Sequence, residues 1–174
     1  MTSQERPLKK TRRGAAGGGA HGTRSGAVPV NRWLMLALRV LIAVALVVSA
    51  VIHFQLAPGF QQAYSSGVGG GTMFRLQGVV AILAGLYVLV RGTPRSYLVA
   101  GLVALASLAA VLVYRYIQIP TIGPIPSMYE PVWYPSKTLT AVAEAIAVAL
   151  AFAGYALSRK RRSESKRRSE SSVS

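Results

Sequence analysis

Four long runs of apolar residues, separated by short stretches rich in glycine, proline and polar residues, dominate the pattern of this 174-residue chain. A helix needs about 20 apolar residues to cross the roughly 30 Å of hydrocarbon in a bilayer, because each residue adds about 1.5 Å. The runs meet this requirement and predict helices over about residues 33–55, 72–90, 97–119 and 136–157. The predicted fold class is therefore all-α, an integral membrane four-helix bundle over residues 32–158.

Local signals define the expected ends of these helices. Pro58-Gly59 should stop the first helix, Pro94 should start the turn into the third, and Pro120 should end the third, because proline interrupts helical hydrogen bonding. Thr72 and Ser136 are candidate N-caps for the second and fourth helices, since a side-chain oxygen can accept from the free amides of a first turn.

The two flanks, residues 1–31 and 159–174, predict disordered basic tails, because they contain almost nothing apolar to bury. Of the twenty Lys and Arg, seven precede Trp33 and seven follow Ser158, so the net charge of +15 belongs mainly to the tails. This distribution argues against nucleic acid as a partner. It favours the lipid bilayer, with anionic lipid headgroups held by the tails.

The C-terminal tail repeats one hexapeptide, Lys-Arg-Arg-Ser-Glu-Ser, over residues 160–165 and 166–171. One interpretation is an anchor to anionic lipid, worth about 1 kcal/mol for each basic residue near the surface. The other is a phosphorylation switch at Ser163 and Ser169, each of which follows basic residues by two or three positions. A phosphate there would cancel about two positive charges and loosen the tail.

The placement of Lys and Arg around the helix ends also predicts the orientation. Both tails and the turn at 91–95 are basic, whereas the loops at 56–71 and 120–135 contain neither Lys nor Arg. Basic loops stay on the cytoplasmic side of a membrane. We therefore expect a multi-pass protein of the cell (inner) membrane with both termini in the cytoplasm.

Polar residues inside the spans are the candidates for chemistry, because a charge in hydrocarbon costs several kcal/mol. Measured at about 1.5 Å per residue, five of them fall in the outer part of the bilayer. This candidate cluster consists of His53, Arg75, Gln77, Arg115 and Glu144. Glu144 is the deepest, and a carboxylate cannot reach water from there, so it should be protonated or paired.

Two interpretations of this cluster stay open. In the first, Glu144 pairs with Arg75 or Arg115 as an interhelical clamp, supported by a ridge of small residues on the fourth helix: Ala141, Ala145, Ala149 and Ala153. In the second, the same residues form a ligand or proton site.

The cluster offers little to a metal or haem. The chain has no cysteine, which removes thiolate ligands and iron–sulfur sites, and it has no aspartate. A second histidine for haem is available only at His21, in the opposite, cytoplasmic flank, so His53 is expected to be hydrogen-bonded or interfacial. No metal and no cofactor are predicted from the residues themselves.

The outer segment 120–135 contains five prolines, which deny it a regular helix, yet Ile122, Ile125, Met128, Tyr129 and Trp133 favour burial. It should lie across the outer end of the bundle. There it is either a lid over the polar cluster or a passive interfacial loop.

The start of the first helix, Leu38-Arg39-Val40-Leu41-Ile42, its polar exit at His53, and the following Pro58-Gly59-Phe60 accompany four short spans. In these features the chain resembles the DoxX-like group of small bacterial membrane proteins over roughly residues 33–157. Members of that group are linked to quinone-coupled oxidation or to membrane redox complexes. The resemblance therefore implies a quinone as a cofactor.

Three functions follow as hypotheses. The first is a non-enzymatic accessory or assembly component of a membrane complex, with a membrane-protein partner or a homo-oligomer, because the loops are short and no soluble domain or cofactor motif is present. The second is a quinone-linked oxidoreductase subunit of the DoxX-like kind. The third is a small transporter, which ranks last because midplane sites and broken helices are not evident.

The orientation can be tested with reporter fusions. Reporters at residues 25, 93 and 165 should lie in the cytoplasm, and those at 65 and 128 outside, because the basic segments are retained on the inner side. A periplasmic signal at residue 93 would overturn the four-helix topology.

Overall fold

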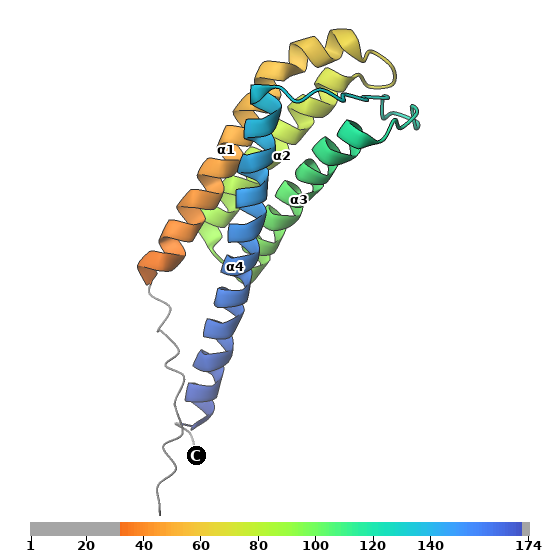
Figure 1. Cartoon of the computed structure of the whole chain (residues 1–174). Helices are drawn as coiled ribbons and strands as arrows, with labels where there is room; N and C mark the ends of the chain where they lie inside the picture. Colours follow the sequence, from red (N-terminus) through yellow and green to blue (C-terminus); the bar gives the residue numbers. More distant parts are fainter. Residues whose placement is uncertain (1–31, 172–174) are drawn as a thin grey trace, which may run out of the picture.

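The computed structural model describes residues 32–171, and these form four helices: α1 (Arg32–Ala63), α2 (Gly70–Arg91), α3 (Pro94–Tyr116) and α4 (Pro135–Ser171). The helices alternate in direction, so the α1–α2 and α3–α4 connections lie at one end of the bundle and the tight α2–α3 turn at the other (Figure 1). The all-α prediction is confirmed for this part of the chain. The predicted tail at 1–31 and residues 172–174 lie outside the described residues.

Each helix packs against two others, α1 against α2 and α4, and α3 against the same two. Large apolar side chains cover the outside as well as the centre, and Val90 is 74% exposed. All four helices are long and apolar enough to cross a membrane. An outer surface of this kind suits lipid and not water, so the structure fits a multi-pass membrane protein.

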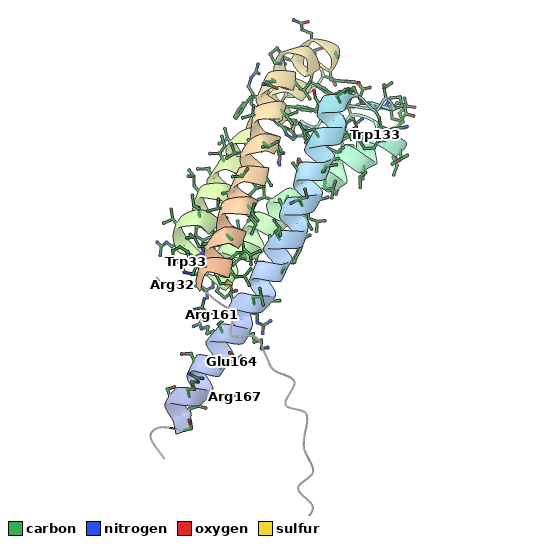
Figure 2. The ribbon with its side chains drawn as sticks, turned by 60° about the vertical axis from the view of Figure 1, so that its left-hand side comes forward. Arg32, Trp33, Trp133, Arg161, Glu164 and Arg167 are labelled. Atoms are coloured by element: carbon green, nitrogen blue, oxygen red, sulfur yellow. The ribbon has the colours of Figure 1, made fainter. Side chains whose placement is uncertain are left out.

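Two tryptophans mark opposite ends of the bundle. Trp33 lies beside the end from which α4 extends, and Trp133 lies beside the α3–α4 connection (Figure 2). Indole rings favour the headgroup region, where one part of the ring is apolar and the N–H can meet water. Their separation fits a membrane that covers the bundle between them.

Helix α1 is longer than expected and continues to Ala63, with Pro58 inside it. The expectation that Pro58-Gly59 stops this helix is therefore wrong. A proline in a helix removes one amide donor and crowds the preceding turn, which bends the helix without ending it when the next turn is stabilised. Figure 1 shows α1 bending over the end of the bundle in its last turns.

Helix α2 begins at Gly70 and not at Thr72, and Gly69 is its N-cap with a φ of 80°. Thr72 is not the cap that was expected. Instead the amide of Thr72 donates to Oε1 of Gln61, in the last turn of α1, at 3.0 Å. A Cβ on Gly71 would lie 2.3 Å from the carbonyl oxygen of Ala57, so glycine at this position lets the two helices approach closely.

Two caps hold the turn between α2 and α3: Gly92, in the left-handed conformation, ends α2, and Thr93 caps α3. Thr93 and Ser96 form a capping box, and Pro94 is the first residue of α3 itself, a position where its missing amide costs nothing. The guanidinium of Arg39 reaches from α1 to the carbonyl of Gly92 at 3.5 Å. A cation at this place also complements the negative end of the α2 dipole.

Helix α4 begins at Pro135, one residue before the expected cap Ser136, and continues to Ser171. The prediction of a disordered tail from residue 159 is therefore wrong up to that residue. The membrane span already supplies a helical nucleus, so extension needs no new nucleation. Basic residues also interact favourably with the C-terminal end of the helix dipole.

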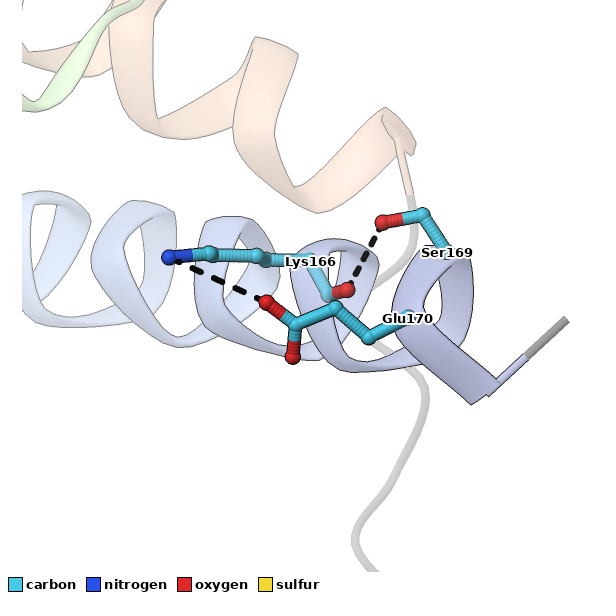
Figure 3. A network of polar contacts seen from close by, with 3 residues as sticks. All are labelled: Lys166, Ser169 and Glu170. Carbon is cyan, nitrogen blue, oxygen red and sulfur yellow. Dashed lines mark hydrogen bonds and ion pairs between the residues drawn. The ribbon is translucent and has the colours of Figure 1, made fainter. Parts of the chain in front are cut away.

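Local pairs support this extension. Lys166 Nζ lies 3.9 Å from Oε1 of Glu170, one turn later, and the hydroxyl of Ser169 donates to the carbonyl of Lys166 at 2.7 Å (Figure 3). An exposed ion pair of this spacing contributes about 0.3–0.5 kcal/mol. These side-chain contacts stabilise the helical extension of α4 slightly, and the continuous helical backbone contributes the remaining stability.

Small residues form the contact between α3 and α4, but not at the alanines expected. Ala145, Ala149 and Ala153 of the predicted ridge are exposed, and Ala141 is partly buried. The buried face of α4 contains Thr140, Ala143, Glu144, Ala147, Ala151 and Gly154. The helix is turned so that its polar Thr140 and Glu144 point inward, which moves the predicted ridge toward the outside.

The substitution Gly154→Ala tests this close contact. A Cβ at Gly154 would lie 2.5 Å from the ring of Tyr97, which is fully buried, so the change should lower the free energy of unfolding by about 1–3 kcal/mol. Thermal unfolding in detergent would measure this.

Gly59→Ala is the matched control, because a Cβ at Gly59 meets nothing within 4 Å. Alanine should stabilise that helical position by up to about 1 kcal/mol. A stabilising effect of Gly154→Ala, like that expected of Gly59→Ala, would show that the Gly154–Tyr97 contact is not close.

Candidate functional site

A cavity of about 320 Å³ lies at the end of the bundle that carries the α1–α2 and α3–α4 connections. All four helices and the loop at 117–134 line it. Its apolar side chains are Leu56, Phe60, Met73, Phe74, Ala106, Ala110, Val111, Ile125 and Met128. Its polar side chains are His53, Gln77, Ser107, Tyr114, Glu130, Tyr134, Lys137 and Thr140.

One wall of the cavity is aromatic. The rings of Phe60 and Phe74 stack with their centroids 4.1 Å apart, and the imidazole of His53 lies 5.1 Å from Phe74. Phe60 is on α1 near the bend and Phe74 is on α2, so these rings connect the two helices as well as lining the cavity. A flat, rigid wall of this kind suits a planar ligand group.

Beneath the cavity, away from the loop, the buried carboxyl group of Glu144 joins three helices. Its Oε1 accepts a hydrogen bond from Ser49 of α1 at 2.8 Å and a second from Ser107 of α3. Glu144 is only 1% exposed. Two hydroxyl donors therefore satisfy one oxygen of a carboxyl group that neither water nor lipid can reach.

Two buried polar atoms in this region have no protein partner. They are Oε2 of Glu144 and Oγ1 of Thr140, one turn apart on α4. Thr140 lines the cavity and is only 4% exposed. Buried oxygens without partners are costly, so these atoms call for a water or a ligand group that hydrogen-bonds to them.

His53 presents its imidazole to the same region. Its Nδ1 lies 2.8 Å from the backbone oxygen of Ser49, and since a carbonyl only accepts, Nδ1 carries the proton and donates. In the neutral ring this leaves Nε2 as an acceptor. The cavity floor therefore combines the His53 imidazole, the Gln77 amide and the hydroxyls of Ser107 and Thr140.

The 117–134 loop forms the roof. It crosses the end of the bundle (Figure 1) and is held by hydrogen bonds from the amide of Val68 to Pro124 and from the amide of Glu130 to Tyr114, both 3.0 Å. The predicted position across the end of the bundle is confirmed, whereas the choice between a lid and a passive interfacial loop stays a prediction. Of the five residues of this segment that were expected to be buried, only Met128 is buried. The other four are exposed: Ile122 at 59%, Ile125 at 42%, Tyr129 at 37% and Trp133 at 40%.

Charged groups gather at the roof. Lys137, in the first turn of α4, donates to the backbone oxygens of Glu130 and, at 3.4 Å, of Val132. Burial and the nearby carboxylate of Glu130 raise the pKa of Tyr134 above its ordinary value of 10.0, so this phenol stays neutral and able to donate. The cavity therefore has polar groups on the side of the 117–134 loop and at the opposite floor, and mainly apolar side chains on the walls between them.

The predicted cluster is only partly assembled. His53 and Gln77 line the cavity, and Glu144 lies behind Ser107 and Thr140. Arg75 is exposed on α2, which makes no extensive contact with α4. Arg115 lies with its guanidinium carbon 5.0 Å from the ring of Tyr116.

The predicted clamp between Glu144 and Arg75 or Arg115 is therefore wrong. The only ion pair among residues 32–171 is the one between Lys166 and Glu170. Arg115 is eight residues beyond Ser107 on α3, about 12 Å along the helix, so it cannot reach a carboxyl group that Ser107 touches. The hydroxyls of Ser49 and Ser107 take the place of the arginines.

Sequence reasoning missed four residues of this site: Ser49, Ser107, Lys137 and Thr140. Serine and threonine are common in membrane helices and often donate to their own backbone, so their presence carries little signal. The sequence did contain one clue. Two other helices each have a serine, Ser49 and Ser107, at about the depth of the buried Glu144.

The remaining candidate residues lie at the other end. Ser163 and Ser169 are exposed on the extension of α4, where their hydroxyls donate to the carbonyls of Lys160 and Lys166 at 2.8 and 2.7 Å. Their modification stays a prediction. Within the described residues no three His, Cys, Asp or Glu side chains come together as metal ligands.

Comparison of the chain with family models, with curated protein sequences and with solved structures finds no match in any of the three. The DoxX-like resemblance therefore stays a prediction, and the site has to be interpreted from its own chemistry.

The serines that bind Glu144 provide a test of the floor. Replacing both Ser49 and Ser107 by alanine should lower the free energy of unfolding by about 2–3 kcal/mol, because it leaves a buried carboxyl group without donors. In a Glu144→Leu background the same double change should cost much less, since no acceptor remains. Thermal unfolding in detergent of all four combinations would give the coupling energy.

Arg115→Leu serves as the control for the rejected clamp. Its effect should add to that of Glu144→Leu without coupling, because the two side chains share no contact. Equal costs of the serine changes with and without Glu144 would contradict the three-helix contact.

Proposed function

We propose that this chain is a multi-pass membrane protein that holds a small amphipathic molecule in the cavity beneath the 117–134 loop. The observation that carries the proposal is the unpartnered Oγ1 of Thr140 in the cavity lining, with the unpartnered Oε2 of Glu144 one turn further along α4, behind that lining. A site built only for helix packing gains nothing from buried oxygens without partners.

Size and polarity support a ligand with one ring and an apolar substituent. Ligand cavities of about 300–1,000 Å³ are typical for small organic molecules, and about 320 Å³ is at the small end of this range. The apolar walls would bury the ring against Phe60 and Phe74, while the floor would bond to its polar substituents. The open acceptors favour a ligand that carries a hydroxyl or another hydrogen-bond donor.

A quinone or quinol headgroup is the ligand class that the DoxX-like resemblance implies, and the residues present fit it. The hydroxyl of Thr140 and the amide of Gln77 can donate to a quinone carbonyl, and the acceptors at the floor suit the hydroxyls of a quinol. This favours the oxidoreductase-subunit hypothesis as the second candidate. The electron partner would have to come from another protein.

A role as an accessory component of a complex is compatible with this site. A subunit that holds an amphipathic cofactor needs no soluble domain and no catalytic motif of its own. We infer that such a partner, or a second copy of the chain, would pack against the apolar outer faces of the helices. Blue-native gels after gentle solubilisation would detect it, and a lone monomer would argue against it.

The inferred orientation also determines which side of the membrane the cavity faces. We infer a cell-membrane protein with both termini in the cytoplasm, because the basic residues of the 91–95 turn and of the α4 extension lie at the end opposite the cavity, and the two connecting loops at the cavity end contain no Lys or Arg. The cavity would then open toward the outer leaflet. The transporter hypothesis has less support, since the residues that line the cavity belong to one end of the bundle.

Filling the cavity tests the proposal. Ala110→Phe places a ring in the cavity, whereas Ala109→Phe adds the same ring to a neighbouring position that is exposed and does not line it. Native mass spectrometry and extraction of the purified proteins should find a small molecule retained by the wild type and by Ala109→Phe but lost from Ala110→Phe. Equal retention by all three would overturn the proposal.

Quenching of tryptophan fluorescence would test the quinone candidate separately. A decyl-substituted benzoquinone should quench Trp133, beside the cavity, in a Trp33→Phe background, and Ala110→Phe should abolish the saturable part of the quenching. Retention of a different molecule with no saturable quenching would leave the cavity as a binding site and exclude the quinone.

A further inference from the structure

A groove of about 650 Å³ lies at the opposite end of the bundle, between the first turn of α3 and the last part of α4. It exists because α4 continues as a helix past its membrane span, whereas α3 begins beside it at Pro94. Four basic side chains line it, Arg95 from α3 and Arg159, Arg162 and Lys166 from α4. No acidic residue lines it.

The three basic residues of α4 share one face of the helix. Positions 159, 162 and 166 are separated by three and four residues, which brings side chains to the same side of an α-helix. Arg161, Arg167 and Arg168 lie on the same segment but do not line the groove. The helical extension thus divides its cations into a groove-facing set and a set that faces elsewhere.

The other side of the groove is apolar and continues into the membrane span. Pro94, Leu98 and the ring of Tyr155 line it. Nη1 of Arg159 lies 3.4 Å from the hydroxyl of Tyr155, so the first cation of the groove is held where the apolar span ends. Lys166 also pairs with Glu170, but this exposed contact at 3.9 Å is weak and leaves the ammonium available.

We propose that this groove is a binding site for the headgroup of an anionic phospholipid. Four cations in a groove whose lining contains no acidic residue match a phosphate with a net negative charge. Arginine can bind phosphate oxygens through two parallel hydrogen bonds. The apolar side, formed by Leu98 and Tyr155, would contact the upper part of the acyl chains. The occupant is a lipid and not a soluble anion because the groove begins at the level where the span leaves the hydrocarbon.

This site differs from the diffuse attraction expected of a disordered tail. A flexible tail attracts anionic lipid in proportion to its total charge, regardless of which basic residue is removed. A helix fixes Arg159, Arg162 and Lys166 relative to Arg95, so the four should act as one stoichiometric site. Residues of equal charge that face away from the groove should then matter much less.

The experiment compares two triple variants of the full chain, each of which loses three positive charges. The groove variant is Arg159→Gln, Arg162→Gln, Lys166→Gln, and the control is Arg161→Gln, Arg167→Gln, Arg168→Gln. Native mass spectrometry in detergent measures binding of phosphatidylglycerol and of phosphatidylcholine, and thermal unfolding without lipid verifies that both variants are folded. We expect one tightly bound phosphatidylglycerol on the wild type and the control, and at least a tenfold weaker affinity for the groove variant.

Arg95→Gln adds an independent check from the other helix. It should weaken phosphatidylglycerol binding several-fold although α4 is unchanged, and it remains informative if the groove triple is unstable. Equal losses in both triple variants would show diffuse attraction and overturn the site. Equal binding of phosphatidylcholine, equal competition by soluble glycerophosphoglycerol, or tighter binding of a polyglutamate peptide would each overturn it as an anionic-lipid site.

Discussion

Polar groups inside this bundle must find their partners within the protein, because hydrocarbon offers none. The carboxyl group of Glu144 shows how this constraint sets the packing. It accepts from Ser49 and Ser107, so one residue of α4 fixes both its neighbours, α1 and α3, at the same depth. Lys137 meets the same constraint through backbone oxygens of the loop, and Arg39 through the carbonyl of Gly92. The rotation of α4 that brings Glu144 inward also decides which alanines are buried.

The cavity forms because the helices pack closely near the α2–α3 turn and less closely near the other end of the bundle. Ala100, Ala104, Ala147 and Gly154 let α3 and α4 approach in the part of the bundle near the α2–α3 turn. Toward the other end, α1 bends in its last turns (Figure 1). Larger side chains, among them Phe60, Met73 and Phe74, line the space between the helices there. The proline-rich loop covers the space that remains. This loop loses little conformational entropy when the protein folds, because the five prolines of segment 120–135 already restrict the backbone of the unfolded chain.

The two ends of the molecule are chemically different, and each favours a different ligand. The cavity end has apolar and aromatic walls with a few hydrogen-bonding groups, which suits a neutral amphipathic molecule. The groove at the other end has four cations and an apolar edge, which suits an anionic lipid. Because they lie at opposite ends of the bundle, loss of one ligand should leave the other bound, and the two proposals can fail independently.

The class of the protein follows from the sequence alone, because apolar runs of spanning length indicate membrane helices. The absence of Lys and Arg from the loops at 56–71 and 120–135 also predicts its orientation. The sequence also singled out Glu144, His53 and Gln77, because a polar residue in a span needs a reason. The partners of these residues became known only from the packing of the helices. Hydropathy gives depth along each helix but not its rotation, so Arg115 was expected where Ser107 is found. Pro58 and the basic repeat also looked like helix ends, yet contacts with α2 and the continuous helix of α4 extend both segments, which are effects that no local pattern contains.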